Sequence, residues 1–321
     1  FLWNICMVEL LVNIAKTARP RQWVKNLTLY AALIFTGNLL PTDWVVRDFR
    51  IVTAGIVAFT LVASGIYFLN DLIDLKADLA HPFKKFRPVA SGKISKTLAF
   101  IIFILSSTLG LILAKQLSVL FFLVVGGYWL MQILYSVWLK NVEVVDVFII
   151  ALGFFLRVLA GGIIINAHLS IWFLLCVISV SLFLAVGKRR AEMAILDVQG
   201  AASHRKVMKF YTPSILDTYL AMFATSSFLS WALFTFNFYE QAGPSTIPTT
   251  LILLSKTLTI NKWLMATIPV VIFGIMRYIR IIYDGSKAET PEKVILQDLP
   301  LLFTVALWAF MVIGVLYIGP S

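Results

Sequence analysis

Charged side chains are scarce in this sequence of 321 residues. Asp, Glu, Lys and Arg make up only 13% of it, whereas hydrophobic residues make up 60%. A soluble domain carries about 25% charged residues. The composition therefore excludes an ordinary soluble domain and predicts an all-α protein that crosses a membrane many times.

Cysteine and histidine are also rare. Cys6 and Cys176 lie far apart in apolar surroundings, which excludes a disulfide framework or a cysteine-based metal site. The three histidines, His81, His168 and His204, are scattered and form no metal-binding set. The sequence also has no nucleophile–base pair and no glycine-rich phosphate loop.

Long apolar stretches dominate what is present. A membrane-spanning helix needs about 20 mostly apolar residues, and nine stretches qualify, the first of which begins with polar residues. They predict a single transmembrane domain over residues 1–321. Two glycine pairs, at 126–127 and 161–162, are expected to permit close helix packing. The nine spans lie at about 22–40, 51–71, 95–114, 117–139, 143–165, 169–188, 214–237, 263–283 and 298–319.

The basic residues are distributed unevenly between the two ends of these spans. With the N-terminus inside, 21 of the 27 Lys and Arg fall in inner segments, and only five fall in outer ones. This positive-inside pattern predicts a multi-pass plasma-membrane protein with a cytoplasmic N-terminus and active site. It also assigns the net charge of +11 to topology and anionic substrates, with no role for nucleic acid. The long inner loops 72–96 and 188–213 are expected to cap the site.

An acidic motif follows the second span. If the helix continues, Asn70, Asp74 and Asp78 share one face, and Asp71 lies beside them. Carboxylates at the mouth of a membrane helix are costly unless they bind something. Oxygen ligands in such a row suit Mg²⁺, which proteins usually hold with one or two carboxylates plus substrate phosphates. The alternative, a merely solvated helix end, is weaker because acidic residues contribute little to orientation.

Basic residues near this motif are candidates for binding phosphate. Lys84 and Arg87 follow within ten residues. Tyr135 and Lys140 are candidates at the loop after the fourth span, where Lys140 is the only basic residue. Lys140 could instead pair with Asp146. Three further groups are candidates for contacting substrate: Gln22, Lys25 and Asn26 at the start of the first span; Arg157 within the fifth span; and Lys188, Arg189, Arg190, Glu192 and Tyr211 around the loop after the sixth.

Residues 70–78 read NDLIDLKAD, which fits the pattern NDxxDxxxD. With the nine spans, this motif resembles the UbiA superfamily of intramembrane prenyltransferases over essentially the whole chain. The strings RPRQWVKN at 19–26, HPFKKFRP at 81–88 and GKRRAE at 187–192 resemble one branch, the decaprenyl-phosphate phosphoribosyltransferases. One departure concerns the second aspartate-rich motif of the prenyltransferases. The matching place here is basic, and Glu192 is its one nearby carboxylate.

The resemblance implies that phosphoribosyl diphosphate donates 5-phosphoribose to a polyprenyl (decaprenyl) phosphate, a step in making cell-wall arabinan. Mg²⁺ on Asp74 and Asp78, supported by Asn70 and Asp71, would hold the diphosphate. The cations Lys84, Arg87 and Lys140 would neutralise the diphosphate as it leaves. The basic cluster 188–190 would hold the 5-phosphate, and the lipid phosphate would lie near residues 22–26, although these two allocations could be exchanged.

Two alternatives stay open from the sequence. The first is a true UbiA prenyltransferase that moves a prenyl group from a prenyl diphosphate to an aromatic or other acceptor. The second is a transporter, which predicts charged residues near the bilayer midplane in both halves. Only Arg157 approaches that position. A homo-oligomer is possible in each case.

Overall fold

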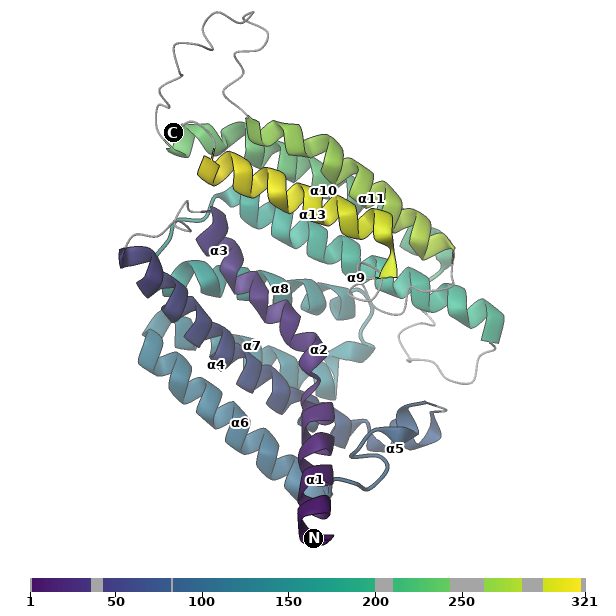
Figure 1. The fold of residues 1–321 in the computed structure, drawn as a ribbon. Coiled ribbons are helices and arrows are strands. Elements are labelled where there is room, and N and C mark those ends of the chain that lie inside the picture. The colour runs from purple at the N-terminus through teal and green to yellow at the C-terminus, as the bar shows by residue number, and fades with distance from the viewer. Residues whose placement is uncertain are drawn as a thin grey trace, which may run out of the picture. The chain divides into compact units, whose positions relative to one another are not determined.

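The computed structural model describes residues 2–35, 43–81, 83–199, 210–242, 263–284 and 297–318. Every regular element in these ranges is a helix, which confirms the all-α fold class (Figure 1). Eight of these helices are long and apolar enough to span a membrane, against nine expected. The eight coincide with the second to ninth predicted spans, so the difference lies in the first.

The stretch 22–40 is not one long helix. Just before this stretch, the chain breaks between α1 (Leu2–Ala18) and α2 (Pro20–Trp23). It then continues through the 3-10 helix η1 (Val24–Leu29) into the short α3 (Tyr30–Phe35). Pro20 favours the first turn of a helix and disfavours helical backbone in the residue before it, so α1 ends at Ala18. Residues 36–40 lie outside the described part.

The chain divides into two compact units, and the first comprises residues 1–36, 41–149 and 156–168. In this unit α4 packs against α6 and α7. Large side chains of α4 and α7, among them Phe59, Phe121 and Tyr128, form its core with Leu29 of η1. The remaining helices of unit 1 are α4 (Asp43–Ile73), α5 (Leu75–Ala80), α6 (Lys96–Leu117), α7 (Val119–Val137) and α8 (Val145–Ile164).

The two glycine pairs differ in what they contact. A Cβ on Gly161 of α8 would lie 2.2 Å from the carbonyl oxygen of Leu29, so only glycine allows η1 to approach α8 this closely. Gly126 and Gly127 of α7 have no described atom within 4 Å of a built Cβ. The expectation of close packing is therefore confirmed for Gly161 and wrong for the pair on α7, within the part of the chain described.

The second unit comprises residues 37–40, 150–155 and 169–321. Here α9 packs against α10 and α11, and α11 packs against α13. Hydroxyl groups link these helices, for example Ser179 Oγ and Ser226 Oγ at 2.8 Å. The helices of unit 2 are α9 (Ile171–Gln199), α10 (Pro213–Ala242), the 3-10 helix η6 (Trp263–Thr267), α11 (Ile268–Tyr283), α13 (Leu299–Ile313) and the π-helical turn η7 (Gly314–Ile318).

Both of the long inner loops begin as helix. The segment 72–96 starts with the end of α4 and with α5, and the segment 188–213 starts with the last turns of α9. Residues 200–209 of the second segment lie outside the described residues. The prediction that the two segments cap the site therefore stays a prediction.

Candidate active site

The acidic motif lies where α4 ends and α5 begins. The backbone turns slightly at Asp74, which stands between the two helices. Helical hydrogen bonding nevertheless continues, because Asp74 N–H donates to Asn70 C=O at 2.9 Å and Asp78 N–H donates to Asp74 C=O at 2.8 Å. Asn70, Asp74 and Asp78 thus keep the one-turn spacing that the sequence predicts.

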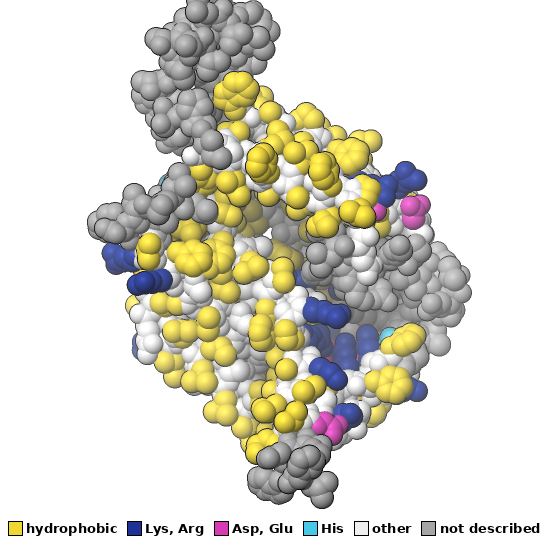
Figure 2. All heavy atoms as spheres, in the orientation of Figure 1, with side chains coloured by type: hydrophobic (Ala, Val, Ile, Leu, Met, Phe, Trp, Pro, Cys, Tyr) yellow, Lys and Arg dark blue, Asp and Glu magenta, His cyan; other side chains and the backbone are white. Residues whose placement is uncertain are grey.

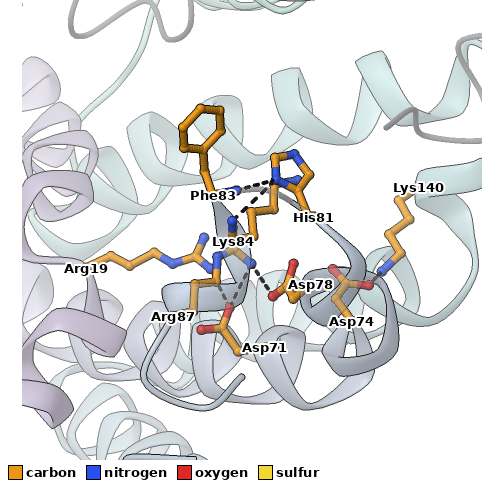
Figure 3. A network of polar contacts seen from close by, with 9 residues as sticks. All are labelled: Arg19, Asp71, Asp74, Asp78, His81, Phe83, Lys84, Arg87 and Lys140. Atoms are coloured by element: carbon orange, nitrogen blue, oxygen red, sulfur yellow. Dashed lines mark hydrogen bonds and ion pairs between the residues drawn. The ribbon is translucent and has the colours of Figure 1, made fainter. Parts of the chain in front are cut away.

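Two arginines converge on the motif (Figure 3). Arg19, at the break between α1 and α2, places Nη2 2.5 Å from Asp71 Oδ1. Arg87 uses Nη1 for both Asp71 Oδ1, at 3.2 Å, and Asp78 Oδ2, at 2.7 Å. The side chains of Asp71 and Asp78 are only 3% and 4% exposed, so their charges are largely removed from water and need these partners.

Asp74 has a different partner. Lys140, on the 3-10 helix η3 (Leu139–Asn141), contacts Asp74 Oδ1 through Nζ. The carboxylate of Asp74 is more open than the other two, with 29% of its side chain exposed. The prediction that Lys140 could instead pair with Asp146 remains untested, since contacts of Asp146 are not all described.

The loop that carries Lys84 and Arg87 is shaped by His81. The Nδ1 atom of His81 accepts the backbone N–H of Phe83 at 3.2 Å and of Lys84 at 3.3 Å, which caps the short 3-10 helix η2 (Lys84–Phe86). Burial, followed by the nearby Lys84 cation, lowers the pKa of His81 below its usual 6.5. A neutral imidazole with an unprotonated Nδ1 is what this cap requires.

A second polar network lies deeper in unit 1. Arg157 of α8 is 5% exposed; its Nε donates to Asn26 Oδ1 and its Nη2 donates to the Tyr128 hydroxyl, both at 2.8 Å. Its guanidinium also lies 4.7 Å from the centre of the Tyr128 ring, within reach of a cation–π interaction. Asn26 in turn donates to Thr60 Oγ1 at 2.9 Å. This network joins η1, α4, α7 and α8.

Two arginines of the basic cluster 188–190 in unit 2 form ion pairs with carboxylates of the same unit. Arg189 is fully buried and donates to Glu192 at 2.6 Å. Arg190 donates to Asp217 at 2.7 Å, and the Tyr283 hydroxyl donates to the same carboxylate at 2.6 Å. Tyr211 is buried, and Lys188 is half-buried. Glu192 therefore serves as an ion-pair partner of Arg189.

The structure brings together some predicted site residues and separates others. The acidic motif, Arg87 and Lys140 form one cluster, and Lys84 lies on the loop beside it. Asn26 instead joins Arg157, while Gln22, Lys25 and Tyr135 are half-buried side chains. Sequence reasoning missed Arg19 and His81, although both lie within the strings RPRQWVKN and HPFKKFRP.

The donor set can be tested against the requirements of Mg²⁺. No three His, Cys, Asp or Glu side chains among the described residues form a ready-made metal cage. Mg²⁺ rarely uses such a cage, because it keeps water and takes substrate phosphates beside one or two carboxylates. The carboxylate of Asp74, with its exposed fraction, and the neighbouring Asn70 and Asp78 fit that mode. The contact between the Lys140 ammonium and Asp74 also shows that this carboxylate can stabilise a cation.

Comparison with known proteins now decides the family. The family model described as the UbiA prenyltransferase family matches residues 27–294. The chain belongs to the UbiA prenyltransferase family. As a family member it is a membrane-embedded transferase, which confirms the predicted enzyme class and fold.

Individual relatives of this UbiA family member are similar over most of its length. It is 33% identical over 301 residues to a decaprenyl-phosphate phosphoribosyltransferase from Mycolicibacterium smegmatis, covering 94% of this chain and 91% of the relative. A protein of the same name from Corynebacterium glutamicum is 32% identical, covering 95% and 87%. A UbiA homolog from Archaeoglobus fulgidus bound to GPP and Mg²⁺ shares the fold, with a TM-score of 0.65, 19% identity and coverage of 95% and 99%.

Proposed function

We propose that this enzyme transfers 5-phosphoribose from phosphoribosyl diphosphate to a polyprenyl phosphate, decaprenyl phosphate in the first instance, and releases diphosphate. The observation that carries the proposal is the 33% identity over 94% of the chain to a protein named for that reaction. A role in cell-wall arabinan synthesis would follow from the same product.

The donor would be bound at the acidic motif. Asp74 and Asp78, with Asn70, would hold Mg²⁺, which when bound would neutralise the diphosphate and orient it. Lys140 and Arg87 already lie on these carboxylates, so positive charge stands beside the place where the diphosphate would gain charge. Lys84 lies on the same loop as Arg87. Fixed cations of this kind stabilise a leaving group because they need no rearrangement as the charge develops.

The chemical step needs little from the protein beyond positioning. A phosphate oxygen of the lipid would attack C1 of the ribose, with inversion, while the bond between C1 and the diphosphate oxygen breaks and diphosphate keeps the electron pair. The attacking oxygen is already ionised at neutral pH, so no general base is required. The described carboxylates of the site are already paired with cations, so they are not arranged as general bases. Catalysis would come from orientation and from stabilisation of the leaving group.

The second candidate is a prenyltransferase that uses a prenyl diphosphate. The observation that favours it is the fold shared with a homolog bound to GPP and Mg²⁺. Against it stands the basic character of the second half, where Arg189 and Arg190 precede the one carboxylate of Glu192. A prenyltransferase of this family would be expected to carry a second aspartate-rich motif at that place.

A product assay separates the two candidates. Purified enzyme in detergent would receive Mg²⁺, decaprenyl phosphate and radiolabelled phosphoribosyl diphosphate, and the lipid would then be extracted. Label in the lipid phase that disappears with EDTA supports phosphoribosyl transfer. Absence of label, together with activity on geranyl diphosphate and an aromatic acceptor, would assign the enzyme to the prenyltransferases.

A further inference from the structure

Asp71 accepts from two arginines in the described part of the chain, whereas Asp78, which is 4% exposed, accepts from Arg87 and Asp74 from Lys140. Asp71 follows Asn70 directly, so on a helix it points about 100° away from the face that Asn70 and Asp74 share. Its side chain is 3% exposed, against 29% for Asp74. Both Arg19 and Arg87 donate to the same oxygen, Oδ1. Asp71 is thus buried against two arginines, whereas Asp74 lies in more open surroundings.

Arg19 sits in a backbone conformation that needs a restraint. Its φ of 55° and ψ of 64° are left-handed, a region that non-glycine residues avoid, and Pro20 follows it. The guanidinium is held by Asp71 at 2.5 Å and lies 4.8 Å from the centre of the Tyr67 ring. Strained residues of this kind persist only where surrounding contacts hold them in place. The joint at Arg19 sets where Gln22 and Lys25 lie.

Arg87 donates to the same oxygen of Asp71 as Arg19 does. The contacts with Asp71 and Asp78 both use Nη1. A guanidinium carries five N–H donors in a rigid plane. The two described contacts through Nη1 therefore restrain the Arg87 guanidinium and leave its Nε and Nη2 donors for a phosphate.

We infer that Asp71 is a positioning residue and not a ligand of Mg²⁺. It acts as a clamp, the Asp71 clamp, which we define as Asp71 with Arg19 and Arg87. The clamp ties the joint between α1 and α2, and the loop that carries Lys84 and Arg87, to the end of α4. The inference rests on the proposed function in so far as the positioned groups serve a phosphorylated donor.

Two substitutions of one kind separate the roles of neighbouring carboxylates. In Asp74→Asn, the Mg²⁺ concentration needed for half-maximal turnover is expected to rise by about 10-fold or more, the effect of disturbing a metal site. In Asp71→Asn that concentration is expected to stay unchanged, while kcat falls by between about 10-fold and about 100-fold, because a misplacement of about 1 Å is enough for such a loss. An Asp71→Asn enzyme that needs as much additional Mg²⁺ as Asp74→Asn would overturn the inference.

Hydrogen exchange in the substrate-free protein gives a readout that does not depend on activity. Asp71→Asn is expected to speed amide exchange in residues 16–24 and 83–88, whereas Asp74→Asn should loosen the 3-10 helix of Lys140 instead. Unchanged exchange in both clamped segments would refute the clamp. If the enzyme transfers no phosphoribose, the proposed function fails while this exchange result still stands.

Arg19→Gly is a second test, and its exchange readout does not depend on the folding of Asp71→Asn. Glycine adopts a φ near 55° without strain, so the joint can form without the guanidinium. Faster exchange in 16–24, with 83–88 still protected by the Arg87 contact, is the expected result. In this background Asp71→Asn should reduce kcat less than it does alone. Equal reductions in both backgrounds would show that Asp71 acts on something other than Arg19.

Discussion

Asp74 is the residue on which the proposed donor site depends most. Asp74→Ala is expected to lower turnover by about 100-fold or more, the scale of losing one group that stabilises developing charge. The protein should remain folded, because Asp74 is partly exposed and its one described side-chain contact, with Lys140, lies at the end of the helices. Turnover in a Mg²⁺-dependent assay and elution from a sizing column together check both statements. An active Asp74→Ala enzyme would contradict the assignment.

Arg157 belongs to the structure of unit 1 rather than to its open surface. Arg157→Met leaves Asn26 and the Tyr128 hydroxyl without their described arginine contacts, and is expected to lower the free energy of unfolding by about 2 kcal/mol. Thermal unfolding in detergent measures the change. Arg50→Met is the matched control, since Arg50 is exposed and its loss should leave the midpoint nearly unchanged.

At the scale of single residues, the sequence predicts which side chains share a face of one helix. It predicts few contacts between residues that are far apart in the sequence. The row Asn70, Asp74, Asp78 follows from the helical period, and the chain confirms that spacing. The bond between Arg19 and Asp71 joins positions 52 apart, and no local pattern marks it. Arg19 and Arg21 look alike in sequence, but Arg21 is exposed whereas Arg19 meets a buried carboxylate.

The short helix η2 depends on a neutral His81. Because the pKa of His81 lies below its usual 6.5, the folded loop binds fewer protons than the unfolded loop at pH values between the two. The stability of the cap is therefore fully present above pH 6.5 and is lost as pH falls through the lowered pKa. The protection factors of the amides in residues 83–87, taken relative to the intrinsic exchange rate at each pH, are expected to fall on acidification.

His81→Asn is the control for this pH effect. An asparagine side-chain oxygen can accept a backbone N–H as a cap but does not titrate in this range. Its protection factors in the same segment should therefore lack the acid-induced decrease. A wild-type loop whose protection does not depend on pH would refute the role of the imidazole.

Helix α8 approaches η1 through Gly161. Gly161→Ala places a methyl group against the Leu29 carbonyl, which is backbone and cannot move aside like a flexible side chain. The free energy of unfolding is expected to fall by about 2 kcal/mol, as in other overpacked sites. Gly127→Ala, in open surroundings on α7, should instead be neutral or stabilise by up to about 1 kcal/mol, because alanine is the better helix former.

Whole helices were the easiest feature to predict. Eight of the nine expected spans are present within a few residues, because length and apolarity decide a span and both are local properties. The described part of the first stretch is divided by the 3-10 helix η1, which a count of apolar residues does not predict. The glycine pair on α7 was misjudged because sequence does not reveal which face meets a neighbour.

At the scale of the molecule, hydrophobic and charged surfaces separate. Figure 2 shows hydrophobic side chains over much of the visible helices of unit 1, with Lys and Arg gathered around α2 and α5. With the excess of Lys and Arg in the predicted inner segments, this pattern leads us to predict that the proposed site lies on the cytoplasmic side.

Cysteine labelling tests that orientation. In a variant with Cys6 and Cys176 replaced by serine, a membrane-impermeant maleimide applied to intact cells should label Lys115→Cys. It should label Lys85→Cys only after the cells are opened. Both lysines are exposed, so accessibility to the reagent is matched. Labelling of Lys85→Cys in intact cells would place the proposed site on the outer side.

The buried guanidinium of Arg157 also bears on how the chain enters the membrane during synthesis. A helix with an arginine near its middle leaves the translocon at a cost of roughly 2.5 to 3.5 kcal/mol for that residue alone. The described side-chain partners, on Asn26 and Tyr128, and Thr60 behind Asn26, all precede position 157. The ribosome has therefore synthesised every one of these groups before α8 emerges. Hydrogen-bond partners for the arginine are thus already present when α8 enters the membrane.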